Sequence, residues 1–151
     1  MDNWKLVLSS LLIGVIYGAI CIYIMGYVAA IAIPKEFFEL LGSKLGYVTI
    51  GIINQFLAFG ILAILTGYAL GKMSSSRWLV SALSCFIGIQ IYGSIGIAYI
   101  YDIDIIWPYS QMTLLLVPES LVMPICLFLS TYLTFKRYNQ QFNLAPTAQI
   151  T

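Results

Sequence analysis

The placement of its charged residues constrains this chain more than any other feature of the sequence. The charges leave four long apolar runs, at residues 6–34, 45–71, 78–101 and 105–135. The first three runs contain no charged residue, and the fourth contains one, Glu119. Each run exceeds the roughly 18–20 residues that cross a hydrocarbon core about 30 Å thick. Because a backbone in lipid must satisfy its own hydrogen bonds, we expect each run to form a helix.

The fold class predicted from these runs is an all-α, polytopic membrane protein with four transmembrane helices in one bundle. The predicted spans lie at about residues 6–33, 46–71, 78–101 and 109–135. Residues 1–151 would form this single membrane domain, and residues 137–151 would be a short polar cytoplasmic tail. Polar chain ends without an anchoring contact are poorly ordered in most domains, so we expect the tail to be loosely ordered.

The connection between the first two predicted spans, residues 34–44, has a pattern of its own. Pro34 suits the first position of a helix and Gly42 suits its end. Apolar and charged side chains between them could form two faces, which predicts a short interfacial helix in this loop. Such a helix could be a structured connector or a docking surface for an external partner.

The basic residues predict the orientation of the chain. If the N-terminus is inside, five basic residues face the cytoplasm and two face outside. The first group comprises Lys5, Lys72, Arg77, Lys136 and Arg137, and the second comprises Lys35 and Lys44. Cytoplasmic loops carry an excess of Lys and Arg. We therefore predict a multi-pass protein of the cell (inner) membrane with both termini in the cytoplasm.

Composition excludes several classes of protein. The chain is 61% hydrophobic and 9% charged, whereas soluble domains are about 45–50% apolar and about 25% charged. Seven basic against six acidic residues provide no basic surface for nucleic acid. The chain has no His, and its three Cys residues form no C-x-x-C pair. We therefore expect no nucleic-acid partner, no metal site and no cofactor.

Glu119 is the candidate site residue that the pattern singles out, because it lies near the middle of the fourth predicted span. A charge at that depth costs about 2.5–3.5 kcal/mol on insertion scales. Its carboxyl group could stay protonated or face a wet cavity or polar partner. Pro118 and Pro124 flank it and each removes a backbone donor from the helix. Glu119 could thus form a proton- or cation-linked site, contact a ligand, or make a structural hydrogen bond.

Three amide side chains are candidate partners for Glu119. Gln90 lies near the centre of the third predicted span, at a depth similar to that of Glu119. Asn54 and Gln55 lie in the outer half of the second span and point about 100° apart, so at most one of them can face Glu119. Amides within spans also form hydrogen bonds between helices, worth about 0.6 kcal/mol on average.

Two G-x-x-x-G patterns predict close helix packing. Gly14 and Gly18 form one, and Gly67 and Gly71 form the other. Small residues at this spacing let helix backbones approach closely. They could mark packing inside the bundle or self-association into a homo-oligomer.

Catalysis is not expected from this set of residues. An intramembrane serine protease needs a base for its serine, and an aspartyl protease needs two acids from separate elements. Glu119 is the only acid deep in a predicted span, while Asp102 and Asp104 lie together in one loop. We therefore predict a non-catalytic protein.

The favoured hypothesis is a small inner-membrane protein that acts through intramembrane helix–helix contacts. It would be a subunit, a regulator or an immunity- or defence-type inhibitor of another integral membrane protein. In architecture the chain is similar to immunity proteins against pore-forming toxins and to membrane subunits of phage-defence systems, which also have few spans and short loops.

The alternative is a small oligomeric proton- or cation-linked transporter or channel that uses Glu119. Four spans are few to enclose a pathway, so such a protein would have to oligomerise. The small multidrug exporters are similar in having four spans and one membrane-embedded Glu. Their Glu lies in the first span, whereas Glu119 lies in the fourth predicted span.

Overall fold

The computed structural model describes residues 3–29, 36, 39–40, 42–74, 77–93 and 121–144. These residues are helical apart from a few turn residues, and no strand occurs among them. The all-helical prediction is therefore confirmed for the described part of the chain. Glu119 and Pro118 lie outside the described residues, as do residues 34, 35, 37, 38 and 41 of the predicted interfacial helix.

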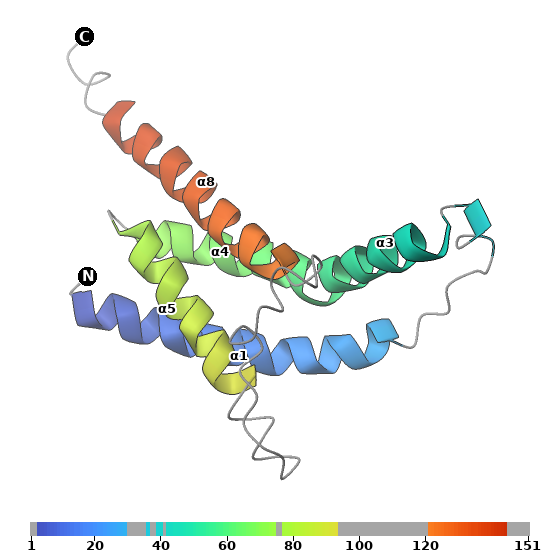
Figure 1. The fold of residues 1–151 in the computed structure, drawn as a ribbon. Coiled ribbons are helices and arrows are strands. Elements are labelled where there is room, and N and C mark those ends of the chain that lie inside the picture. The colour runs from blue at the N-terminus through green and yellow to red at the C-terminus, as the bar shows by residue number, and fades with distance from the viewer. Residues whose placement is uncertain are drawn as a thin grey trace.

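Four rods make up the structure (Figure 1). The first is α1 (Asn3–Ala29). The second is a continuous run of α3 (Ser43–Gln55), the π-helical segment η1 (Phe56–Gly60) and α4 (Ile61–Met73). The third is α5 (Trp78–Ile91), and the fourth is α8 (Val122–Leu144). The first three rods begin or end near charged residues, namely Lys5, Lys44, Lys72 and Arg77.

Two of these rods are long and apolar enough to cross a membrane. They are Asn3–Val28 and Leu45–Met73, and Trp78–Ile91 is a shorter apolar helix. Length and composition of these helices are those of a helical membrane protein.

The described helices combine a core of mainly small and medium-sized side chains with a strongly apolar outer surface. The side chains with almost no exposed surface are mainly small or of medium size, namely Ser10, Cys21, Ala63, Leu70, Ser81, Ala82, Cys85, Leu127 and Thr131. Large apolar side chains are exposed along every described rod, for example Leu12, Ile16, Leu65, Leu83, Ile87 and Leu129. In water such a surface would drive association. Such a surface fits a lipid surrounding, because lipid tails are as apolar as these side chains.

The helices α1 and α5 form a close pair. The hydroxyls of Ser10 and Ser81 are 2.8 Å apart. Further along both helices, a Cβ added to Gly14 would overlap the carbonyl group of Cys85, and one added to Gly18 would lie 3.1 Å from the ring of Tyr92. Because these contacts advance toward higher residue numbers along both helices, α1 and α5 are parallel.

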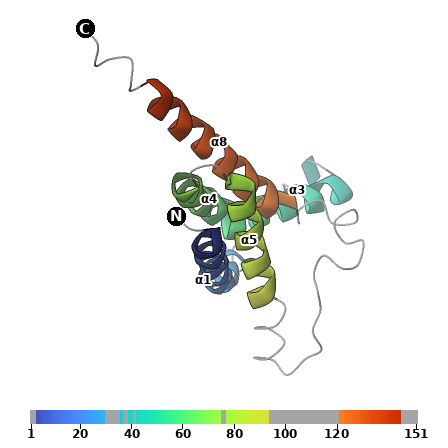
Figure 2. The same cartoon turned by 90° about the vertical axis from the view of Figure 1, so that its left-hand side faces the viewer.

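A second close pair is formed by α4 and α8. Gly67 packs against Leu127 and Ser130, and one turn later Gly71 packs against Thr131 and Thr134. These contacts again advance together, so α4 and α8 are also parallel. Figure 2 looks along α1 and α4 and shows α5 and α8 crossing beside them.

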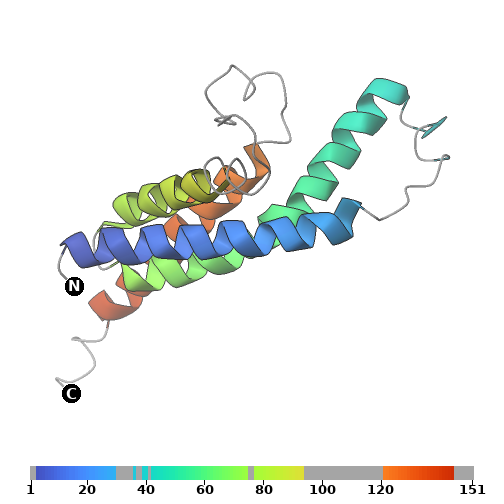
Figure 3. The ribbon, with the colours of Figure 1, turned by 90° about the horizontal axis from the view of Figure 1, so that it is seen from below.

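The two pairs meet in one hydrophobic core. Tyr17, Cys21, Ala63, Leu70, Cys85, Ile89, Met123 and Leu127 form this cluster, which draws on all four rods. At its centre the Tyr17 hydroxyl donates a hydrogen bond to the carbonyl oxygen of Phe59, over 2.7 Å. The colour gradients of α1 and α4 run in opposite directions in Figures 1 and 3, so these two helices are antiparallel.

The last helix corrects the predicted boundary near residue 135. α8 continues to Leu144 and so includes residues that we expected to belong to a loosely ordered tail. Loss of hydrophobicity ends a membrane span, but it does not end a helix. Residues 136–144 contain no Gly or Pro, and the helix ends just before Pro146.

Candidate functional site

The structure places the predicted amide residues on helices that do not pack together. Asn54 and Gln55 are the last two residues of α3, and Gln90 lies near the end of α5. All three side chains are half-buried. Over their described residues α3 packs against η1 and α8, whereas α5 packs mainly against α1 and also against α8 and α4. Whether Glu119 meets any of them lies outside the described residues.

Pro124 lies in the first turn of α8, which begins at Val122. The first four N–H groups of a helix have no partner within it, so a proline here removes no hydrogen bond from the helix. Within the described part of α8, Pro124 therefore lies where a helix tolerates proline well. Its effect on the preceding part of the fourth predicted span lies outside the described residues.

The π-helical segment η1 follows directly after Asn54 and Gln55. The N–H of Ile61 bonds to the carbonyl of Phe56, five residues earlier, which defines the wider π turn. Figure 3 shows that the rod bends in this region and that α3 leaves the direction of α4. The hydroxyl of Tyr17, which is 2% exposed, bonds to a carbonyl inside this segment. Single π turns occur frequently at functional sites, and no residue pattern in the sequence predicted this one.

Three thiols lie in or against the core cluster that contains Tyr17. Cys21 of α1 and Cys85 of α5 belong to the buried core with Tyr17, and Cys126 of α8 packs against it. All three are free thiols. The described residues contain no group of three Cys, Asp or Glu side chains placed to hold a metal ion. The thiols therefore serve as small core side chains in this arrangement.

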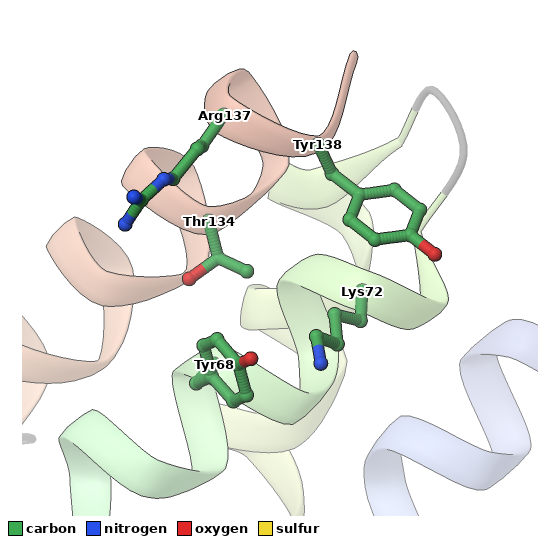
Figure 4. A pocket seen from close by; sticks show the side chains of 5 residues that line it. All are labelled: Tyr68, Lys72, Thr134, Arg137 and Tyr138. Carbon is green, nitrogen blue, oxygen red and sulfur yellow. The ribbon is translucent and has the colours of Figure 1, made fainter. Parts of the chain in front are cut away.

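A pocket of about 260 Å³ lies between the C-terminal part of α4 and α8. Its lining comprises Tyr68, Lys72, Thr134, Arg137 and Tyr138 (Figure 4). The ammonium nitrogen of Lys72 lies 4.4 Å from the centre of the Tyr68 ring, a cation–π contact. The sequence showed only that Lys72 and Arg137 follow two span ends on the same predicted side. That their helices are neighbours comes from the glycine contacts of α4 with α8.

No family model, curated protein or solved structure matches this chain. Its function therefore has to be inferred from its physical features. Three stand out among the described residues: the apolar outer faces, the bend at η1 beside two amides, and the pocket with two basic side chains.

Proposed function

We propose that this chain is a multi-pass inner-membrane protein whose four transmembrane helices form one bundle, with both termini in the cytoplasm. Successive spans of an up-and-down bundle alternate in direction, so the first and third run parallel, as do the second and fourth. The parallel pairs α1 with α5 and α4 with α8 support this topology, as does the antiparallel run of α1 and α4. The five basic residues predicted to be cytoplasmic agree with it.

Within this topology the protein acts without catalysis, by contacting a transmembrane helix of another integral membrane protein. It would serve as a subunit, a regulator or an immunity- or defence-type inhibitor. The observation that carries this proposal is the position of α3 beyond the bend at η1. There its side chains are strongly exposed, with Tyr47 at 68% and Leu45 at 60%. Among the described elements, α3 has only a small contact with α8 besides its contact with η1.

Two features distinguish the exposed surface of α3 from an ordinary lipid-facing surface. The Gly pairs that permit close helix approach already face α5 and α8, so they are used inside the protein. Asn54 and Gln55, by contrast, make no side-chain hydrogen bond within the described part of the chain. An amide side chain without a hydrogen-bond partner costs free energy in apolar surroundings, because lipid tails offer no hydrogen bond. A helix with a polar side chain beside Asn54 or Gln55 would give one of these amides a hydrogen-bond partner and cover α3.

Site-specific photocrosslinking in the membrane of the native cell tests the proposal. A photoreactive residue replaces Tyr47, and the matched control replaces Leu12 on α1, which is 57% exposed. We expect position 47 to yield one adduct of defined mass with a second membrane protein, and position 12 to yield none. The double substitution Asn54→Leu, Gln55→Leu should abolish that adduct.

Two results would refute the proposal. One is an adduct at position 47 that contains only a second copy of this chain. The other is an adduct pattern that is the same at positions 47 and 12, since α3 would then behave as any lipid-facing helix. A persistent adduct in the double variant would show that the amides take no part in recognition.

A further inference from the structure

The pocket between α4 and α8 combines two basic side chains with three hydroxyl groups. Lys72 and Tyr68 come from α4, and Thr134, Arg137 and Tyr138 come from α8. Figure 4 shows Arg137 and Lys72 on either side of Thr134. Every side chain of the lining can donate a hydrogen bond. Such a set of donors is suited to a ligand rich in acceptor oxygens.

None of the described side chains that line this pocket is a carboxylate. The acidic residues that the structure describes, Glu36 and Glu39, precede α3 in the sequence, whereas Lys72 lies at the end of α4. Two cations that share one small pocket repel each other, and an anion between them would remove that repulsion. The pocket therefore calls for a negatively charged ligand.

The position of the pocket narrows the class of anion. Lys72 lies at the end of the apolar segment Leu45–Met73, where a membrane span gives way to the headgroup layer. Tyrosines are enriched at this level, and two of them line the pocket. Basic side chains at the cytoplasmic surface attract anionic lipid headgroups. An Arg guanidinium can hold two phosphate oxygens at once, while a Lys ammonium adds a point charge.

We propose that this pocket binds a phosphate group, supplied by the headgroup of an anionic phospholipid or by a free phosphate ester. Arg137 and Lys72 would hold the phosphate oxygens from the two helices, and Thr134 would donate a hydrogen bond between them. The cation–π contact with Tyr68 positions the Lys72 ammonium at the pocket. A bound phosphate would also join α4 to α8 at this end of the pair. This site is separate from α3 and does not depend on a protein partner there.

The lipid arm of the test uses the full chain purified with an equal mixture of phosphatidylglycerol and phosphatidylcholine. Native mass spectrometry measures the ratio of the two lipids that remain bound. Arg137→Gln and Lys72→Gln should each lower the phosphatidylglycerol preference about tenfold, the usual effect of losing one charge-assisted hydrogen bond. Lys136→Gln is the matched control, because it removes the same charge from the neighbouring, exposed position outside the pocket.

The second arm uses inorganic phosphate with protein in a neutral detergent, and chloride of equal ionic strength as the reference. It measures the shift in melting temperature of the full chain and of the same three variants. Stabilisation that disappears in Arg137→Gln assigns the site to phosphate groups in general. A phosphatidylglycerol preference without stabilisation by phosphate assigns it to the lipid headgroup.

Three outcomes would overturn the proposal. In the first, neither phosphatidylglycerol nor phosphate distinguishes the full chain from its Arg137→Gln and Lys72→Gln variants. In the second, Lys136→Gln reduces binding as strongly as the pocket variants, which would reflect overall charge alone. In the third, both pocket variants keep the phosphatidylglycerol preference of the unmodified chain.

Discussion

Gly14 lies at the contact between α1 and α5, where the backbones leave no room for a side chain. A Cβ added there would lie 2.9 Å from the carbonyl carbon of Cys85 and 3.1 Å from its Cα, and nearer still to the carbonyl oxygen. These are backbone atoms of a helix, so they cannot turn aside as a flexible side chain would. We therefore predict that Gly14→Ala forces α1 and α5 apart.

The magnitude follows from three contributions to the free energy of unfolding. Overpacking a well-packed site costs about 1–3 kcal/mol. Separation of the helices also strains the Ser10–Ser81 hydrogen bond, one turn away, and such bonds are worth about 0.6 kcal/mol. The better helix propensity of Ala offsets about 0.8–1 kcal/mol. We expect a net loss of roughly 0.5–3 kcal/mol.

Gly26→Ala is the matched control for this prediction. It makes the same substitution in the same helix, but an added Cβ there meets nothing within 4 Å. With no steric cost, its effect should be neutral or stabilising by up to about 1 kcal/mol. The two variants should therefore differ by roughly 1.5–3.5 kcal/mol, with Gly14→Ala the less stable.

The assay is an SDS titration of the purified protein in mixed micelles, with unfolding followed by tryptophan fluorescence and by helix content. If Gly14→Ala and Gly26→Ala unfold at the same SDS fraction, the close contact of α1 with α5 does not limit the stability of the protein. A gain in stability for Gly14→Ala would contradict the packing of this helix pair altogether.

The remaining predictions use the same preparation. Ser10→Ala and Ser81→Ala, alone and combined, should give a coupling energy of about 0.6 kcal/mol and at most about 1.7; additive effects would show that the two hydroxyls do not interact. Tyr17→Phe removes the donor to the Phe59 carbonyl and should lower the unfolding free energy by about 1–3 kcal/mol, whereas unchanged stability would contradict that bond. If the protein is instead a carrier, Glu119→Gln should abolish proton or cation flux in liposomes without changing assembly, measured by size exclusion. Unchanged flux would exclude the transport alternative.

Sequence reasoning was most successful where a property depends on the solvent around the chain. Long uncharged runs predicted helices, because in lipid a backbone has no other donors or acceptors. The described helices α1, α4 and α5 fall on these runs. α8 continues past the predicted end of the fourth span near residue 135. Hydropathy reports where a chain leaves lipid, whereas the continuation of a helix depends on local backbone propensity.

The features of the candidate sites were harder to predict. The π turn at η1 depends on a shift of one residue in the hydrogen-bond register, which has no distinct residue signature here. Gln90 was predicted as a partner of Glu119 because the two residues lie at a similar depth in their spans. Depth is a one-dimensional property, and it does not determine which helices are neighbours.

The sequence by itself predicted the helical class and four apolar runs, because both follow from local composition, and two of the described helices are long and apolar enough to cross a membrane. Only the tertiary structure decided which helices pair, since each Gly motif could have faced lipid, a second copy or a neighbour in the same chain. The contacts of Gly14 with α5 and of Gly67 with α8 resolved that choice within the described residues. The pairing of α4 with α8 then placed Lys72 and Arg137 in one pocket. Two charges that mark separate span ends in the sequence thus line a single site, because a site depends on the neighbours of a helix as well as on its depth.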